Sequence, residues 1–299
     1  MTSQTGKKIL ITDLDNTLWD WFDAWYRSFS AMLAQLTETS GVPQEVLERE
    51  IRAIHQERGT TEYSWLIGEI PVLIDTAAPA DPAVVYDDAV HVLNSQRRAT
   101  TRLYPGVKEG LMKLRRLDVR IVAYTESVAY WSEWRIRHTG LDGIIDVLYS
   151  APDHDLPAGR GIGDLRMLPP TEYGLKRTRH NHIPRGVLKP NARVLQSILD
   201  EQGFHPEEAV YLGDSLMKDI AMAQQAGVMD VYAKYGESQS RAGYDLLRRV
   251  SHWSDADVAR EREIAQSIDI VVPTVTCQRL FGEVLPLFER TLDRDHVKG

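Results

Sequence analysis

The sequence predicts an α/β protein: a doubly wound parallel sheet with an all-helical segment inserted after its first strand. From about residue 103 onward, short apolar runs typical of strands alternate with amphipathic helical patterns, as in parallel sheets. Between residues 19 and 102, by contrast, apolar positions recur at helical spacing and strand patterns are almost absent. Several of the predicted strands also end in small polar or acidic residues, which indicates a site at one edge of the sheet.

The first element is the run I-L-I-T-D-L-D-N-T-L from Ile9 to Leu18, an apolar strand that ends in two carboxylates. Side chains alternate along a strand, so Asp13 and Asp15 point the same way at its carboxyl end. Two carboxylates this close repel each other unless a cation lies between them or one holds a proton. A turn with two solvated acids explains this stretch equally well, so the other strand ends decide between the two interpretations.

Aromatic residues dominate the start of the inserted segment, from Trp19 to Phe29, and their spacing predicts a helix to about Thr37. We expect these rings to pack inside the helical segment rather than to stack on bases. Further helical patterns follow, and they cover Val46–Ile54, Trp65–Ile70 and Val84–Leu93.

After the insertion, strands and helices alternate. The predicted strands are Val119–Tyr124, Ile144–Tyr149, Ala209–Leu212, Val228–Ala233 and Ile268–Val272. The predicted helices are Val107–Leu117, one that contains Trp131, Trp134 and Ile136, Asn191–Glu201, one that runs to Ala226, Ala242–Val250 and Thr276–Leu292. A capping box is expected at Ser254 and Asp257.

Residues 151–186 interrupt the alternation with a segment rich in proline and glycine, which predicts a long loop. Towards its end the segment contains a basic cluster: Lys176, Arg177, Arg179, His180, His182 and Arg185. A solvated loop is the default interpretation, and His180 and His182 are then ordinary loop residues. The alternative is a loop that overhangs the site and binds a second phosphate or a carboxylate of the substrate.

Polar residues that could form one site follow three of the strands. Asp13 and Asp15 follow the first, Thr125 follows Val119–Tyr124, and Asp214 follows Ala209–Leu212. Lys189 precedes a helix and Asp219 lies within one. If the strands are parallel neighbours, six residues gather at one edge of the sheet: Asp13, Asp15, Thr125, Lys189, Asp214 and Asp219. Carboxylates, a hydroxyl and an ammonium suit Mg²⁺ together with phosphate oxygens, and there is no His/Cys cluster of the kind that zinc sites need.

With these residues in this order, the sequence resembles the haloacid dehalogenase superfamily. The four motifs are D-x-D-x-T at Asp13 to Thr17, a strand that ends in Thr125, Lys189-Pro190, and G-D-S-x-x-x-D from Gly213 to Asp219. The resemblance covers residues 7 to about 235. It implies a Rossmann-like catalytic core from residues 1–18 and 103–299 and a helical cap domain from residues 19–102 that closes over the site.

The resemblance also implies a role for each matching residue. Asp13 would be the nucleophile and Asp15 the general acid and base, while Thr125 and Lys189 would hold the phosphoryl oxygens. Mg²⁺ would be bound by the Asp13 carboxylate, the main-chain carbonyl of Asp15 and Asp214, with Asp219 binding directly or through water. Because Asp15 is a carboxylate, phosphate-ester chemistry is expected and dehalogenation is not.

The sequence therefore predicts a Mg²⁺-dependent phosphatase that acts on a small phosphorylated metabolite. A phosphomutase of the same family and a non-catalytic binding protein with the same fold remain alternatives. The net charge of −8 argues against nucleic-acid and anionic-membrane partners, and the single cysteine, Cys277, excludes an intrachain disulfide. The polar N-terminus and the lack of an apolar run of roughly 20 residues predict a cytoplasmic protein without a membrane span. The sequence determines neither the substrate nor the oligomeric state.

Overall fold

A seven-stranded parallel sheet forms the base of the molecule in the computed structural model, which describes residues 6–256, 259 and 271–289. The strand order is β4-β3-β2-β1-β5-β6-β7, and every neighbouring pair is parallel. Their bounds are β1 Ile9–Thr12, β2 Arg120–Val128, β3 Val147–Ala151, β4 Arg179–His182, β5 Ala209–Gly213, β6 Met229–Ala233 and β7 Val275–Cys277. The chain builds the sheet outward from β1 in both directions, which confirms the doubly wound fold.

Helices cover both faces of this sheet, because successive strand residues alternate between two apolar clusters. Leu10 packs with α7 (Val107–Arg116), α8 (Ala129–His138) and the 3₁₀ segment η5 (Phe281–Leu287). Ile9 and Ile11 point to the opposite face and pack with the remaining helices, α10 (Ala192–Gln202) and α11 (Ala221–Gln225). This period of two along β1 is the pattern that a strand buried on both faces requires.

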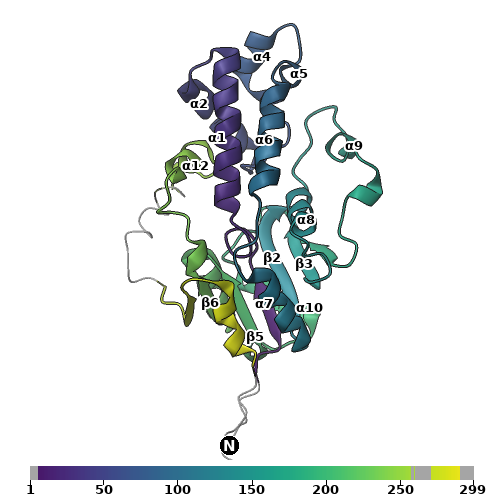
Figure 1. The fold of residues 1–299 in the computed structure, drawn as a ribbon, viewed down its shortest axis with the longest axis vertical. Coiled ribbons are helices and arrows are strands. Elements are labelled where there is room, and N and C mark those ends of the chain that lie inside the picture. The colour runs from purple at the N-terminus through teal and green to yellow at the C-terminus, as the bar shows by residue number, and fades with distance from the viewer. Residues whose placement is uncertain (1–5, 257–258, 260–270, 290–299) are drawn as a thin grey trace, which may run out of the picture.

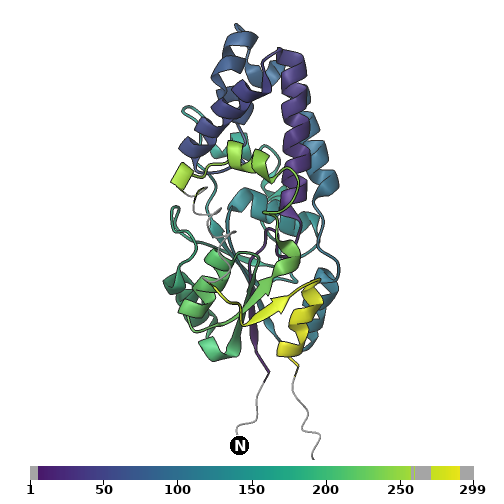
Figure 2. The same ribbon diagram turned by 90° about the vertical axis from the view of Figure 1, so that its left-hand side faces the viewer.

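The inserted segment is entirely helical and stands above the carboxyl ends of the strands (Figures 1 and 2). Its helices are α1 Trp21–Ser40, α2 Gln44–Arg58, α3 Leu66–Glu69, α4 Pro71–Ala77, α5 Pro82–Val85 and α6 Asp87–Thr100. Helix α1 begins where Asp20 Oδ1 accepts a hydrogen bond from the Asp23 N–H (2.9 Å), an N-cap. The chain enters and leaves this segment side by side, since the Tyr104 N–H donates to the Leu18 carbonyl (2.9 Å).

A helix from the C-terminal region completes the apolar cluster of the inserted segment. Helix α12 (Tyr244–Val250) was predicted, but it packs on α1 and α2 rather than on the sheet (Figure 1). Tyr244, Leu246, Leu247 and Val250 share one buried cluster with Phe22, Trp25, Leu47 and Ile51. We therefore propose that the cap comprises α12 in addition to residues 19–102.

Three predictions about the C-terminal part need correction or lie outside the described residues. The predicted helix Thr276–Leu292 is wrong over its described part: β7 occupies Val275–Cys277 and a 3₁₀ segment occupies Phe281–Leu287. Of the predicted strand Ile268–Val272 only Val271 and Val272 are described, and neither lies in a strand. The capping box at Ser254 and Asp257 depends on Asp257, which lies outside the described residues.

The predicted loop 151–186 contains an edge strand. Residues 179–182 form β4, which pairs in parallel with β3, so His180 and His182 are strand residues rather than loop residues. Lys176, Arg177 and Arg179 lie where β4 begins, at the amino edge of the sheet, so these three do not overhang the site as the alternative interpretation required. Arg185 lies beyond the carboxyl end of β4 and pairs with Asp155.

Among the described residues, no helix is long and apolar enough to cross a membrane.

Candidate active site

The D-x-D-x-T segment lies directly beyond β1, the strand next to which the sheet changes direction, as ligand sites of such sheets do. The Asp13 N–H donates to the Leu212 carbonyl of β5 (2.8 Å), which extends the sheet by one residue. The chain then turns through Asn16, which has a positive φ of 57° and accepts a hydrogen bond from the Phe22 N–H through its side chain (2.9 Å). Gly236 packs against the Asn16 carbonyl so closely that it leaves no room for a Cβ. The loop that carries Asp13 is thus held from both sides.

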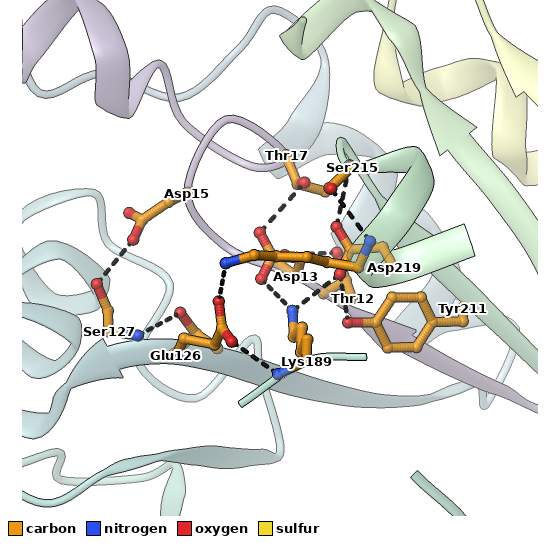
Figure 3. A network of polar contacts seen from close by, with 12 residues as sticks. Thr12, Asp13, Asp15, Thr17, Glu126, Ser127, Lys189, Tyr211, Ser215 and Asp219 are labelled. Carbon is orange, nitrogen blue, oxygen red and sulfur yellow. Dashed lines mark hydrogen bonds and ion pairs between the residues drawn. The ribbon is translucent and has the colours of Figure 1, made fainter. Parts of the chain in front are cut away.

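Lys189 lies at the centre of the site and bridges two carboxylates. Its Nζ donates to Asp13 Oδ1 (2.6 Å) and to Asp219 Oδ1 (2.9 Å), as Figure 3 shows. The side chain is 3% exposed and lies near the faces of the Tyr124 and Tyr211 rings. Asp219 is fixed in turn, because it also accepts from the Tyr211 hydroxyl (3.0 Å) and the Ser215 N–H (3.1 Å).

One ammonium group does not balance the carboxylates that surround it. Burial raises the pKa of Asp13 to about 7, and the negative charges of Asp219 and Asp15 add to this effect while Lys189 opposes it. Burial, followed by the charges of Asp13 and Asp219, likewise holds the pKa of Asp214 well above its usual range. Ionising all of these carboxyl groups together is therefore unfavourable unless a further cation is present.

Three of the predicted metal ligands converge. Carboxylate oxygens of Asp13, Asp214 and Asp219 all lie within 4.8 Å of one another. Oxygen donors of this kind, with uncompensated negative charge, fit Mg²⁺. The Asp15 carboxylate does not belong to this group, so its predicted role as a ligand concerns its main-chain carbonyl alone.

The Asp15 side chain turns away from Asp13, Lys189 and Asp219, toward Ser127 (Figure 3). Its Oδ1 accepts from Trp19 Nε1 (2.6 Å) and its Oδ2 accepts from Ser127 Oγ (2.8 Å). Thr125, the remaining predicted site residue, lies buried on β2 near its carboxyl end, where its hydroxyl accepts from the Ser127 N–H (3.1 Å). Asp13 and Asp15, two residues apart, thus have different partners.

Several residues around the site were not predicted. Glu126 accepts from the Lys189 N–H (2.7 Å) and from Lys218 Nζ (2.6 Å), and so fixes the backbone at Lys189. Glu126 and Ser127 directly follow Thr125, so the search for polar residues at strand ends could have found them. Nothing in the sequence pointed to Arg135 of α8, which is buried and has one guanidinium nitrogen 3.6 Å from Asp15 Oδ1.

A cavity of about 430 Å³ lies among α1, α3, α6, the start of α8 and the segment 157–167, and none of the predicted site residues lines it. Its wall is mostly apolar, and the aromatic lining residues are Trp25, Phe29, Tyr63, Trp65, Tyr130 and Trp131. Arg97 of α6 stacks over the Trp131 ring (4.1 Å), and Trp131 Nε1 donates to the Glu62 carbonyl (2.9 Å). Volume and lining are those of a small-molecule pocket.

Comparisons with known proteins agree with this geometry. A family model described as haloacid dehalogenase-like hydrolase matches residues 7–165, more than half of the chain, and a second model with that description matches residues 181–233. A glyceraldehyde 3-phosphate phosphatase from Methanopyrus kandleri is 25% identical over 271 residues, 88% of this chain and 97% of that protein.

Solved structures show the same fold. A 2-haloacid dehalogenase from Pseudomonas syringae pv. tomato superposes with a TM-score of 0.51 at 18% identity, over 94% of this chain and 96% of that one. A haloacid dehalogenase-like family hydrolase from Xanthomonas campestris gives 0.51 at 16% identity, over 88% and 97%. With its doubly wound sheet, its carboxylate cluster and its match to the family model, the chain belongs to the haloacid dehalogenase-like hydrolases.

Proposed function

We propose that the protein is a Mg²⁺-dependent phosphatase that hydrolyses phosphomonoesters of small metabolites through an aspartyl-phosphate intermediate. The observation that carries this proposal is the contrast between Asp13 and Asp15. Asp13 faces Lys189 and the other carboxylates, whereas Asp15 is held apart by Trp19 and Ser127. Two carboxyl groups in different environments suit a nucleophile and a general acid and base.

In the first step, an Asp13 carboxylate oxygen forms a bond to phosphorus while the ester P–O bond breaks. Asp15 gives its proton to the departing oxygen, which leaves as an alcohol. In the second step, Asp15 takes a proton from a water molecule whose oxygen bonds to phosphorus. The bond between phosphorus and Asp13 then breaks, which releases phosphate and restores both carboxyl groups.

The chain's own cations and donors stabilise the charge on the transferring group. Lys189 would hold a phosphoryl oxygen, and the Thr125 hydroxyl would hold another. Mg²⁺ would be held by Asp13, Asp214 and the Asp15 carbonyl, with Asp219 beside it, and when bound it neutralises phosphoryl charge. Without a further cation the buried carboxylates would repel a phosphate dianion.

The cap would receive the rest of the substrate. The cavity has room for the organic part of a metabolite, and Glu62 in its wall pairs with Arg135, whose Nη1 lies 3.6 Å from Asp15 Oδ1. The phosphatase named among the relatives acts on glyceraldehyde 3-phosphate, which supports a small phosphorylated metabolite as the substrate class. We include glyceraldehyde 3-phosphate in the test panel for this reason.

The test is phosphate release from a panel of phosphorylated metabolites with Mg²⁺, in wild type and Asp13→Asn. We expect the wild type to hydrolyse some of them and Asp13→Asn to lose activity by about 10³-fold or more, because the amide cannot act as the nucleophile. Asp75→Asn, at an exposed cap position, is the matched control and should keep full activity. Isotopically labelled water should place its oxygen in the released phosphate; transfer of the phosphoryl group back to substrate would favour a phosphomutase instead.

A further inference from the structure

Arg135 of α8 lies between the proposed general acid and the cap. One arm of its guanidinium pairs with Glu62 Oε1, and the other nitrogen, Nη1, lies 3.6 Å from Asp15 Oδ1. The side chain is only 3% exposed, and Nη1 has no hydrogen-bond partner among the described residues. A buried donor without a partner is costly, so its direction toward Asp15 calls for an explanation.

Glu62 comes from the cap, in the loop that joins α2 to α3. It is buried and held in place, since its backbone N–H donates to Thr60 Oγ1 (3.1 Å) and its carboxylate accepts from Trp21 Nε1 (3.3 Å). Burial opposes the charge of Glu62, but Arg135 and then Arg97 outweigh burial and hold its pKa below the usual range. The Glu62 carboxylate, the Arg135 guanidinium and the Asp15 carboxylate thus form one continuous line of charged groups from the cap to the core.

We propose that Arg135 is a positioning residue for Asp15, and that Glu62 of the cap loop holds Arg135 in place. Proton transfer by Asp15 then depends on contact between this loop and α8. This inference rests on the proposed function, because it concerns the step in which Asp15 protonates the departing oxygen as the P–O bond breaks and the bond to Asp13 forms. Correct placement matters at this step, because a proton is transferred only at hydrogen-bond distance.

A purely structural ion pair would behave differently, and substrates with different leaving groups separate the two roles. An alkyl phosphate needs a proton on its leaving oxygen. The leaving group of p-nitrophenyl phosphate, p-nitrophenolate, is a stable anion and departs with little help from an acid. We would measure kcat/KM, which reports the first phosphoryl transfer, for one alkyl phosphate that the wild type hydrolyses and for p-nitrophenyl phosphate. The main variant is Arg135→Lys, because it keeps a cation beside the buried Glu62 and so protects the fold.

For Arg135→Lys we expect kcat/KM to fall by about tenfold or more with the alkyl phosphate and by less than about threefold with p-nitrophenyl phosphate, since positioned general acids contribute about 10²–10⁴-fold. Glu62→Gln should show the same selectivity with a smaller loss. Glu133→Gln is the matched control, since Glu133 is also buried on α8 and ion-paired, but with Arg166, and its other carboxylate oxygen contacts His180 Nδ1 rather than Asp15. It should affect the two substrates by equal factors.

Equal losses with both substrates in Arg135→Lys, or no loss with either, would overturn the positioning role. A selective loss in Arg135→Lys that is absent in Glu62→Gln would overturn the part assigned to the cap loop. Neither result bears on the proposed function, which is tested separately by phosphate release and water-oxygen labelling in the wild type and by the loss of activity in Asp13→Asn.

Discussion

At the scale of single residues, the site is organised around one buried lysine that faces more carboxylates than it can neutralise. Lys189 pairs with Asp13 and Asp219, and Asp214 lies beside them. Breaking a buried ion pair leaves an uncompensated charge, so such a centre depends on each member. This explains why the residues of the four motifs are found together although they are spread from Asp13 to Asp219.

A glycine behind the nucleophile loop gives a steric prediction. A Cβ at Gly236 would lie 1.7 Å from the Asn16 carbonyl oxygen, so Gly236→Ala must displace the turn between Asp13 and Thr17. We expect a loss of about 1–3 kcal/mol in the free energy of unfolding and a clear drop in kcat. Urea denaturation and steady-state kinetics would measure both.

Gly163→Ala is the control for this substitution, since a Cβ there meets nothing within 4 Å. It should change neither quantity by much. If Gly236→Ala were as harmless as Gly163→Ala, the close packing behind Asn16 would not matter for the site.

The sequence was sufficient to predict the motif residues but not their partners in the cap. Three of the motifs follow a predicted strand, and strand order brings strand ends together, so Asp13, Thr125 and Asp214 could be grouped without coordinates. Lys189, which precedes a helix, joined them through its place in the third motif of the family. Arg135 and Glu62 meet only because the cap sits on α8 in a particular way. No local pattern contains that information.

At the scale of elements, the contact between α12 and α2 contains a pH-dependent interaction. His55 of α2 is fully buried, and its Nδ1 lies 2.6 Å from the Val250 carbonyl at the end of α12. Burial lowers the pKa of His55 to about 4, although the bond to Val250 opposes this shift. The folded protein therefore keeps this imidazole neutral.

This histidine should make the protein less stable in acid. Between pH 6.5 and about pH 4 the unfolded chain binds a proton that the folded chain does not, so the contribution of His55 is complete above pH 6.5 and is lost as the pH falls toward 4. The lost stability amounts to about 3 kcal/mol at most. Urea unfolding at pH 7.5 and pH 4.5 should show a smaller pH effect in His55→Gln than in wild type; the same pH effect in both would rule His55 out as its source.

Elements were predicted best where apolar periodicity was long and worst at the C-terminal end. Apolar residues at positions 281, 284, 285 and 288 have helical spacing, yet Pro286 lacks an N–H and the segment forms a 3₁₀ helix instead. The short β7 carries few residues from which to recognise it. Strand β4 was missed because R-H-N-H has none of the apolar character of a strand, and its pairing with β3 depends on its neighbour.

At the scale of the whole molecule, a bound cation would join segments that are far apart in sequence. Asp13 follows β1, whereas Asp214 and Asp219 follow β5, so a metal ion held among them would link two central strands. Binding to the folded state alone stabilises it, by about 2.7 kcal/mol at a hundred times the dissociation constant. We therefore expect Mg²⁺ to raise the melting temperature of the wild type.

Asp214→Asn should remove most of this increase, because it takes away one charged oxygen donor, whereas Asp75→Asn should leave it intact. Thermal melts with and without Mg²⁺ would measure the difference. An equal Mg²⁺ effect in Asp214→Asn and wild type would place the cation somewhere else.

The return of the chain from its C-terminal third to the cap affects how the protein can be made. During synthesis Phe22 of the cap cluster emerges early, but Tyr244 and Val250 of the same cluster emerge more than 200 residues later. The cluster around Leu10 likewise waits for Cys277 and Phe281, and Ile9 waits for its strand partner Ala209. Until then the nascent chain exposes unfinished apolar surfaces, and we expect the fold to be completed only once Phe281 has emerged.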